Sequence, residues 1–257
     1  MTDLSAGCQD KDRYDRQRRI DWIDMDGIFQ SKILVAGAGA LGNEVVKNLV
    51  LSGFRHIDVV DMDEIVLSNL NRCLFFRDSD VKKIPKAVAV ANKASELSPD
   101  AYVCPIVGKV QDIQTWDYDI VIGCLDNILA RMHVNSHACY HGIPYIDGAT
   151  DGMRGKVNAV LPGGPCLQCT MNKTHIREME KRFSCTGDAV MFVPHLASDV
   201  TTTSVVAAMQ VREAMKIASR RYDLCIRNVC YYDGTAGDMF ILEVTTDPNC
   251  PNHEVQK

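Results

Sequence analysis

The residues best suited to chemistry in this 257-residue chain lie between positions 33 and 72. A short apolar segment at 33–36 is followed by Gly37, Gly39 and Gly42, and then by the apolar spacing of a helix. Such glycines allow a tight turn, a close approach of the backbone to phosphate and close helix packing, while the helix start favours an anion. The pattern predicts a nucleotide site, although a strand-to-helix turn that binds no ligand would need similar residues.

A second apolar segment, at 57–60, ends in Asp61, whose carboxylate is suited to binding both ribose hydroxyls. Polar and charged residues then crowd the expected carboxyl end of this strand, where α/β sheets bind ligands: Asp63, Asn69, Asn71 and Arg72. They are suited to orienting ribose, phosphate and a metal ion, and the arginine to neutralising phosphate charge. A nicotinamide cofactor has no use for so many polar groups near its phosphates, so the segment favours a nucleoside triphosphate.

Three motifs carry a resemblance to a known family: Gly37-Ala-Gly39-Ala-Leu-Gly42, Asp61-Met-Asp63 and Ser68-Asn-Leu-Asn-Arg72. They resemble the adenylation domain of ubiquitin-activating enzymes, a superfamily that includes bacterial activators of sulfur-carrier proteins. The resemblance covers nearly the whole chain, and residues 33–170 are closest to catalytic subunits of eukaryotic heterodimeric activating enzymes. Two residues depart from the family pattern, since Ala40 replaces a common third glycine and Cys73 replaces a usual glutamine. We expect Ala40 to crowd the phosphate loop slightly, and neither change to abolish binding.

The composition limits the class of protein. Apolar residues make up 46% of the chain, charged residues 24%, and the net charge is −5, which argues against nucleic acid as the main partner. No run of 18 apolar residues occurs, so we expect no membrane span. The polar N-terminus lacks a secretory signal, and eleven cysteines, an odd count, suit a reducing compartment. We therefore expect a cytoplasmic protein that uses cysteine for metal binding or thiol chemistry.

Apolar periodicity predicts alternating strands and helices, and hence an α/β fold: a Rossmann-like, mostly parallel sheet with helices on both faces, continued by antiparallel strands. Residues 1–30 are expected to form an N-terminal arm, helical over 13–30, and residues 31–257 a single ATP-binding adenylation domain. Further helices are predicted at 82–97, 128–141 and 202–219. Further strands are predicted at 102–106, 120–123, 144–146, 157–161, 226–232 and 239–245, with a long crossover segment at about 162–199.

Two short pairs of metal-ligating residues stand far apart, Cys166-Leu-Gln-Cys169 and Cys250-Pro-Asn-His253. Together they supply four ligands, the number of a closed structural zinc site, and a two-residue spacer lets each pair turn onto one ion. The resemblance implies the same site, with His253 in place of a usual cysteine. We predict a zinc clip joining 166–169 to 250–253, the alternative being a loop with two thiols and a frayed tail.

One cysteine is a candidate nucleophile. Cys185 follows Lys181 and Arg182 closely, and nearby cations favour the reactive thiolate. By resemblance, its position is that of the cysteine that takes the carrier protein as a thioester, or that acts in sulfur transfer in thiamin-pathway members. The cysteines outside this position and the zinc pairs are expected to be structural or incidental: Cys8, Cys73, Cys104, Cys124, Cys139, Cys225 and Cys230.

Further candidates depend mainly on the resemblance. It implies that Lys86 binds phosphates, that Asp126 binds magnesium and phosphate, and that Arg16 is an arginine finger reaching a neighbouring subunit. Each has a simpler alternative, since Lys86 and Arg16 suit solvated surfaces and Asp126 suits the N-cap of the next helix. The four-residue spacing of His133, His137 and His141 suggests a metal, but we interpret these histidines as one side of a surface helix.

The resemblance implies an activating enzyme that uses ATP and Mg²⁺ to adenylate the C-terminal glycine of a ubiquitin-like protein ending in Gly-Gly. A thioester on Cys185 would follow, with a conjugating enzyme as a further partner. Because Arg16 belongs to the same chain, we expect a homodimer. The alternative is a sulfur-carrier adenylyltransferase that leads to a thiocarboxylate. A third interpretation, a non-catalytic scaffold subunit or an NAD-binding protein, leaves Arg72, Lys86 and Asp126 without a use.

Overall fold

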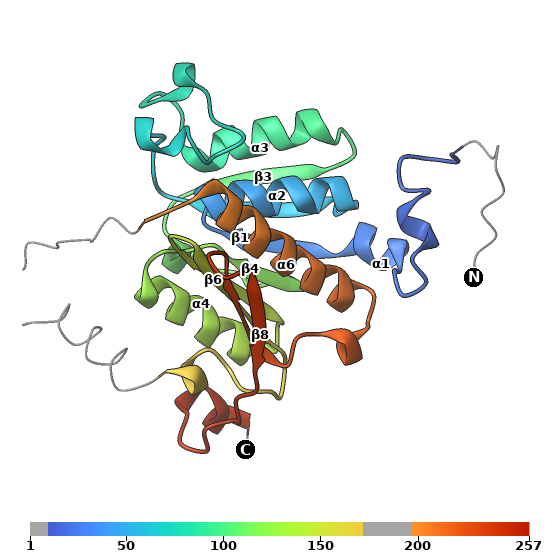
Figure 1. The fold of residues 1–257 in the computed structure, drawn as a ribbon, viewed down its shortest axis with the longest axis vertical. Coiled ribbons are helices and arrows are strands. Elements are labelled where there is room, and N and C mark those ends of the chain that lie inside the picture. Colours follow the sequence, from blue (N-terminus) through green and yellow to red (C-terminus); the bar gives the residue numbers. More distant parts are fainter. Residues whose placement is uncertain (1–9, 172–196, 257) are drawn as a thin grey trace, which may run out of the picture.

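The computed structural model describes residues 10–171 and 197–256, which form an eight-stranded sheet with helices on both faces (Figure 1). The strand order is β3-β2-β1-β4-β5-β6-β7-β8. The strands are β1 (Lys32–Ala36), β2 (His56–Asp61), β3 (Tyr102–Val107), β4 (Ile120–Gly123), β5 (Tyr145–Asp151), β6 (Arg154–Val160), β7 (Asn228–Asp233) and β8 (Asp238–Leu242).

The first five strands pair in parallel and the last three in antiparallel fashion. The predicted α/β sheet with an antiparallel continuation is therefore confirmed. Strands β5 and β6 are longer than predicted, because they pair directly as a hairpin that turns at Gly152, where φ is +57°. Residues 147–151 have little apolar character of their own, so this pairing, rather than local pattern, makes them a strand.

Helices α2 (Ala40–Ser52), α3 (Lys86–Leu97) and α6 (Val200–Ala218) cover one face of the sheet, where α2 packs against both α3 and α6 (Figure 1). Helix α4 (Ile128–His141) covers the other face. Strand β1 explains the two layers: Ile33 and Val35 join the core under α2, while Leu34 and Ala36 join the core under α4. A strand buried on both faces needs a continuous apolar run, which residues 33–36 supply.

The N-terminal arm is less helical than predicted. It contains the short helix η1 (Gln17–Arg19) and the six-residue helix α1 (Met25–Gln30). The arm breaks between them because Ile20 is extended, and because the Asp24 side chain accepts a hydrogen bond from the Asp26 amide and so starts a new helix. Tyr14 nevertheless packs the arm against the domain, in edge contact with Phe29.

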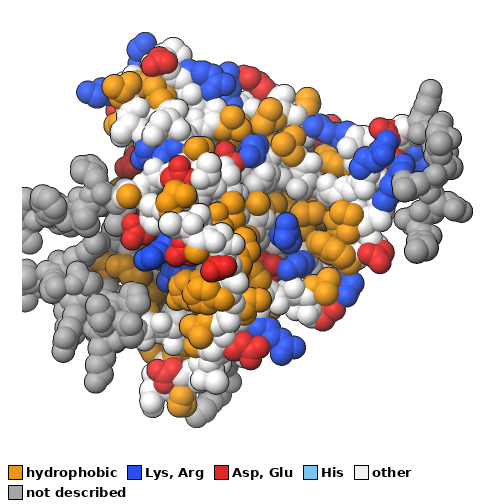
Figure 2. Space-filling model, viewed as in Figure 1, with side chains coloured by type: hydrophobic (Ala, Val, Ile, Leu, Met, Phe, Trp, Pro, Cys, Tyr) orange, Lys and Arg blue, Asp and Glu red, His pale blue; other side chains and the backbone are white. Residues whose placement is uncertain are grey.

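The remaining regular elements are short 3-10 helices: η2 (Leu67–Asn69), η3 (Asp78–Asp80), η4 (Val110–Asp112), η5 (Gln168–Thr170), η6 (Tyr222–Leu224) and η7 (Pro251–Gln256). Strand β8 lies at the outer edge of the sheet and exposes four apolar side chains, Met239, Phe240, Ile241 and Leu242. Figure 2 shows hydrophobic side chains gathered in this part of the surface. Over the ranges that are described, no helix is long and apolar enough to cross a membrane.

Candidate functional site

The glycine loop joins β1 to α2 at the carboxyl edge of the parallel strands. Gly37 has φ +103°, which only glycine adopts readily, and its amide donates to the Val60 carbonyl oxygen at 2.8 Å. A Cβ on Gly37 would lie 2.5 Å from the carbonyl oxygen of Cys124, and one on Gly42 would lie 2.0 Å from that of Gly37. Packing of the protein itself therefore requires Gly37 and Gly42.

Gly39 differs from these two glycines. It is the N-cap of α2, its φ is −73°, and no side chain caps the helix there. A Cβ on Gly39 would meet nothing within 4 Å, so neither backbone nor packing demands glycine. The open space before a helix start suits a phosphate, as the sequence predicted. Ala40 is the first residue of α2, and its backbone is not strained. The described non-glycine residues with positive φ are Lys82, Arg220 and Asn228.

We interpret Gly42 as a structural glycine and Gly39 as a glycine that a ligand requires. We expect Gly39→Ala to change the free energy of unfolding by less than about 0.5 kcal/mol, but to weaken ATP binding at least about tenfold. Gly42→Ala should lower the free energy of unfolding by about 1–3 kcal/mol, because its Cβ overlaps the backbone. Calorimetric ATP titrations and urea unfolding measure the two effects. Equal losses of stability in both variants would contradict the assignment.

Asp61 ends β2 beside the glycine loop, and the loop fixes its carboxylate. One oxygen accepts from the Ala38 amide at 2.7 Å and the other from the Asp63 amide at 2.8 Å. Burial raises the pKa of this carboxyl, while the two amides oppose that shift. Each carboxylate oxygen has a second lone pair, so Asp61 is oriented by the backbone and still able to accept ribose hydroxyls.

Asp63 and Lys86 lie together at the same edge. The Lys86 Nζ contacts the Asp63 carboxylate at 2.7 Å, and the Lys86 amide donates to the Asp63 carbonyl oxygen at 2.9 Å. The Lys86 side chain is only 12% exposed. The solvated-lysine alternative for Lys86 is therefore wrong. The first residue of α3 is held against the end of β2, where a cation faces the predicted phosphate position.

The loop after Asp63 holds the other three predicted ligands. Asn69 is buried, and its Oδ1 accepts from the Val66 amide at 3.0 Å, which gives it a role in the loop itself. The Arg72 guanidinium donates to the Ser68 carbonyl oxygen and, at 2.9 Å, to the Asn71 Oδ1. Arg72 and Asn71 are therefore linked at the carboxyl edge, whereas Asn69 points into the protein. The ligand roles of all three stay predictions.

Asp126 follows β4 in a loop tied to β1 by a hydrogen bond from the Cys124 amide to the Ala36 carbonyl oxygen, at 2.7 Å. The N-cap of α4 is Asn127, whose Oδ1 accepts from the Leu129 amide at 2.9 Å. The capping alternative for Asp126 is therefore wrong by one residue. Asp126 is exposed and forms no hydrogen bond or ion pair with another described residue, so its carboxylate is available for Mg²⁺.

Five of the six described cysteines outside the metal cluster behave as structural residues, the exception being the exposed Cys104. Burial raises the pKa of Cys73 to about 11 and that of Cys225 to about 12, and it also raises the pKa of Cys124 and Cys230. A hydrogen bond with Cys166 and burial raise the pKa of Cys139. These thiols stay protonated near neutral pH, as an inert role requires. The predicted nucleophile Cys185 and also Cys8 lie outside the described residues.

Arg16 lies far from the glycine loop of its own chain. It is exposed and pairs with Asp10 at 3.1 Å, while the neighbouring Gln17 donates to the Ser52 carbonyl oxygen at 2.8 Å. Ser52 is the last residue of α2, whose 13 residues begin at the glycine loop. Since a helix rises 1.5 Å per residue, about 20 Å separates its two ends. Arg16 therefore lies near the opposite end of α2 from Gly37, in the N-terminal arm that Figure 1 shows beside α1.

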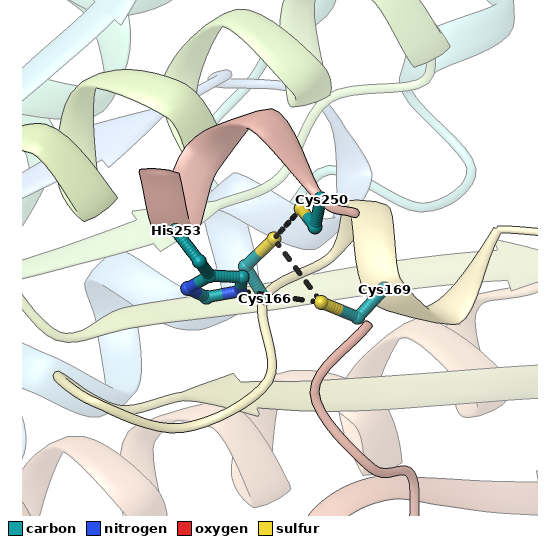
Figure 3. A group of neighbouring side chains, drawn as sticks. All are labelled: Cys166, Cys169, Cys250 and His253. Carbon is teal, nitrogen blue, oxygen red and sulfur yellow. Dashed lines mark hydrogen bonds between the residues drawn. The ribbon is translucent and has the colours of Figure 1, made fainter. Parts of the chain in front are cut away.

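The predicted metal ligands meet at one point, and their donor atoms lie within 4.8 Å of one another (Figure 3). The Cys166 Sγ is 3.6 Å from that of Cys250 and 3.8 Å from that of Cys169, which lies 3.2 Å from the His253 Nε2. Zinc–sulfur bonds of 2.3 Å at tetrahedral angles place two sulfurs about 3.8 Å apart. The four residues therefore fit a tetrahedral zinc ion.

The cluster is anchored to the rest of the domain. The Leu167 amide donates to the Asn135 Oδ1 of α4 at 2.8 Å, and the Asn252 Nδ2 donates to the Gln168 Oε1 at 3.1 Å. Cys166 and Cys250 belong to the apolar core under α4. The arrangement therefore joins the beginning of the crossover segment to the C-terminal turn, as predicted for a clip.

Removing one ligand should release the metal. We expect wild-type protein to carry about one zinc per chain and Cys166→Ser to retain well under half of it, with a loss of several kcal/mol of unfolding free energy. Elemental analysis after gel filtration and thermal unfolding measure both quantities. Cys104→Ser, at an exposed cysteine of β3, is the matched control and should change neither. Metal-free wild-type protein of unchanged stability would refute the site.

The three spaced histidines of α4 do not form a second metal cluster. His137 stacks on Trp116 with ring centroids 4.7 Å apart, and His133 and His141 flank it. Among the described residues, only the cluster at Cys166 brings three or more ligating atoms together. The prediction that His133, His137 and His141 line one side of a helix is confirmed.

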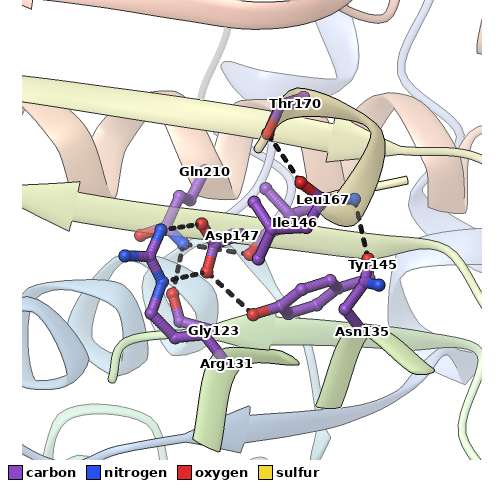
Figure 4. A network of polar contacts seen from close by, with 9 residues as sticks. All are labelled: Gly123, Arg131, Asn135, Tyr145, Ile146, Asp147, Leu167, Thr170 and Gln210. Carbon is purple, nitrogen blue, oxygen red and sulfur yellow. Dashed lines mark hydrogen bonds and ion pairs between the residues drawn. The ribbon is translucent and has the colours of Figure 1, made fainter. Parts of the chain in front are cut away.

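Sequence reasoning missed a buried polar network behind the Asp126 loop (Figure 4). Arg131 of α4 donates two hydrogen bonds to Asp147 of β5, one of them at 2.9 Å, and the Tyr145 hydroxyl donates to the same carboxylate at 2.8 Å. The Gln210 amide from α6 donates to the Gly123 carbonyl oxygen at 2.8 Å. Asp147 directly follows the residues predicted as a strand at 144–146, and a charged residue at that place was the available signal for this network.

Comparison with known proteins agrees with this arrangement. The family model described as "ThiF family" matches residues 14–252. The NEDD8-activating enzyme E1 catalytic subunit of Arabidopsis thaliana is 40% identical over 157 residues, covering 54% of this chain and 34% of that protein. The SAMP-activating enzyme E1 of Haloferax volcanii is 28% identical over 262 residues, covering 96% of this chain and 90% of that protein.

The fold is also similar to solved structures. The crystal structure of E. coli MccB with AMPCPP and SeMet MccA has a TM-score of 0.78 at 19% identity, covering 96% of this chain and 76% of that one. The chain spans about a third of the length of several curated relatives it matches, such as the NEDD8-activating subunit of Schizosaccharomyces pombe, 37% identical over 56% of this chain and 34% of that protein. Because the family model matches well over half of the sequence, the chain belongs to the ThiF family.

Proposed function

We propose that this chain is an activating enzyme that uses ATP to adenylate the C-terminal carboxylate of a ubiquitin-like or sulfur-carrier protein ending in Gly-Gly. One observation carries the proposal: four features share one edge of the sheet. They are the open space at Gly39, the oriented carboxylate of Asp61, the paired cation of Lys86 and the carboxylate of Asp126, which no described residue engages. The names of the relatives, which are activating enzymes, support the same reaction class.

Each part of the edge has a proposed task. The loop with Gly37, Gly39, Ala40 and Gly42 cradles the phosphates, and Asp61 binds the ribose hydroxyls. Arg72, Lys86 and Asn71 contact the phosphate oxygens, and Asp63 positions Lys86 by their ion pair. Asn69 contributes through the loop that it stabilises. Asp126, with Asp63, would hold Mg²⁺, which supplies neutralisation of phosphate charge when bound.

The reaction needs little beyond positioning and charge. A carboxylate oxygen of the protein substrate attacks the α-phosphorus of ATP while the bond to the bridging oxygen of pyrophosphate breaks. The products are an acyl-adenylate and pyrophosphate, and the electron pair of the broken bond leaves with pyrophosphate. No general base is required, because the attacking carboxylate is already ionised. Lys86 and Arg72 stabilise the charge that gathers on the leaving group.

The proposed second step is attack of the Cys185 thiolate on the acyl-adenylate carbonyl carbon. A thioester forms and AMP leaves, after which a conjugating enzyme would accept the modifier. The alternative is sulfur transfer to the same adenylate, which produces a thiocarboxylate. Similarity to NEDD8-activating subunits favours the thioester. Two features argue against the scaffold and NAD-binding alternatives: the pairing of the largely covered Lys86 side chain with Asp63, and an Asp126 carboxylate that no described residue engages.

The assembly proposed is a homodimer in which Arg16 of one protomer approaches the triphosphate of the other. Its place at the far end of its own domain supports action between protomers rather than within one. The zinc clip has a structural role, and the free thiols described here suit the reducing cytoplasm. A net charge of −5 gives no support to nucleic acid as a partner.

Mass spectrometry tests the two-step proposal. The protein is incubated with ATP, Mg²⁺ and small carrier proteins ending in Gly-Gly, and Cys185 is then examined for a reducible carrier adduct. We expect the adduct in wild-type protein and its loss in Cys185→Ser, with Cys104→Ser as the control. A thiocarboxylate product without the adduct would support the sulfur-carrier alternative. Absence of both products with every carrier would contradict the proposal.

A further inference from the structure

A second cation lies close to the buried network of Figure 4, and no described residue balances its charge. Asp147 is fully buried, and both of its carboxylate oxygens are engaged: Arg131 contacts both, and the Tyr145 hydroxyl adds a bond to one at 2.8 Å. The Arg131 guanidinium and the Asp147 carboxylate therefore neutralise each other. Any further charge beside them remains uncompensated within the network.

That further charge belongs to Lys156 of β6. In the β5–β6 ladder Asn158 faces Asp147 and Lys156 faces Ala149, so Lys156 shares the α4 side of the sheet with Asp147. It lies two residues further toward the carboxyl end of β5. The side chain is half-buried and forms no ion pair with a described residue. Burial lowers the pKa of Lys156, and the charge of Arg131 lowers it further, while Asp147 partly opposes both.

The buried pair and Lys156 together contribute two cations and one carboxylate, while Asp151 adds an exposed carboxylate at the end of β5. A half-buried ammonium without a counterion is costly, and proteins usually pair such a group. Lys156 lies near the carboxyl end of β5. Asp126 lies at the same edge of the sheet, after the neighbouring strand β4. An anionic ligand at this edge would neutralise the positive charge of Lys156.

We infer that Lys156 binds the C-terminal carboxylate of the protein substrate and holds it for adenylation. This inference rests on the proposed function and adds the residue that receives the reacting group. A carboxylate fits better than the triphosphate, because β6 is three strands away from β1 and its glycine loop. At about 4.8 Å per strand, that separation is about 14 Å. Lys156 forms no covalent bond in this scheme.

Model tails test the contact without requiring turnover. Peptides ending in Gly-Gly with a free carboxylate, and matched peptides ending in the amide, are titrated calorimetrically into the protein with a non-hydrolysable ATP analogue. We expect wild-type protein to prefer the carboxylate peptide about tenfold. Lys156→Gln should reduce the preference to less than about twofold, and Lys156→Arg should retain most of it. Lys93→Gln, at a surface lysine of α3 paired with Glu96, is the control.

The outcomes separate this inference from the proposed function. If wild-type protein shows no carboxylate preference, or Lys156→Gln keeps it while remaining folded by circular dichroism, the inference is wrong. If Lys156→Gln instead weakens ATP binding as strongly as peptide binding, Lys156 faces phosphate and the inference is also wrong. Carrier-dependent pyrophosphate exchange by wild-type protein tests the proposed function independently of either result.

Discussion

Asp126→Asn is expected to lower carrier-dependent pyrophosphate exchange by about three orders of magnitude, the scale at which removal of one group that organises transition-state charge acts. The reason lies in the position of this carboxylate. It is exposed at the end of β4, makes no bond to another described residue, and adjoins the glycine loop through the hydrogen bond from the Cys124 amide to the Ala36 carbonyl oxygen, at 2.7 Å. An amide of the same shape lacks the charge that Mg²⁺ requires.

The control for this substitution is Asp100→Asn, at an exposed aspartate before β3. It should leave exchange unchanged within about twofold, since it is a surface substitution away from the site. Both variants should unfold at the wild-type temperature, because Asn127 rather than Asp126 caps α4. Substantial exchange by Asp126→Asn at saturating Mg²⁺ would contradict the role of Asp126. A large loss of stability would instead show that the residue is structural.

The largest effect on stability is expected for Arg131→Met. This change leaves the buried Asp147 carboxylate without its bidentate partner, and breaking a buried pair in this way costs about 3–5 kcal/mol of unfolding free energy. Lys32→Met, which removes an exposed pair with Asp117 at 3.4 Å, should cost less than about 1 kcal/mol. Equilibrium unfolding in urea measures both changes in the free energy of unfolding. The dependence of that free energy on urea concentration should be the same in all variants.

The double variant Arg131→Met/Asp147→Leu separates the cost of an unpaired charge from the loss of packing. It should regain much of the lost stability, because no buried carboxylate then remains. If the double variant is as unstable as Arg131→Met, the unpaired Asp147 carboxylate is not the cause of the lost stability. A single variant that loses less than about 1 kcal/mol would mean that the pair behaves as a surface ion pair.

Local pattern was sufficient to predict the fold class, whereas the roles of the candidate site residues stay predictions. The apolar run at 33–36, followed by Gly37 and Gly42, encodes a buried strand and a tight turn, because each residue type is demanded by its immediate neighbours. Asp63, Asn71 and Arg72 were expected at the carboxyl end of the second strand because they follow Asp61, whereas the role of Asp126 came from the family resemblance. The metal pairs were recognisable because each is a short motif with its own geometry.

The errors and omissions concern interactions between distant segments. Arg131 joins α4 to Asp147 of β5, and Gln210 joins α6 to the Gly123 carbonyl oxygen of β4. No local spacing indicates either contact. The hairpin of β5 and β6 likewise depends on pairing rather than on apolar content. Lys86 illustrates the same limit, since only the fold shows that its side chain is buried against Asp63.

The spacing of residues in the sequence also cannot predict which of two adjacent side chains caps a helix. Asp126 and Asn127 are adjacent, and either residue type caps helices well. The difference of one position matters for the proposed magnesium role, because Asn127 is occupied as the cap, whereas Asp126 has no partner among the described residues. The same holds for Asn69 and Asn71, where burial of the first leaves the second beside Arg72.

The most direct test of the central claim is isotope exchange between radiolabelled pyrophosphate and ATP. The account predicts exchange by wild-type protein that requires Mg²⁺ and a carrier with an intact Gly-Gly carboxylate, and that disappears when the carrier lacks its last glycine. Exchange requires reversible formation of an adenylate, so it reports the proposed step itself. Exchange that is independent of any carrier, or none with a panel of ubiquitin-like and sulfur-carrier proteins, would contradict the account.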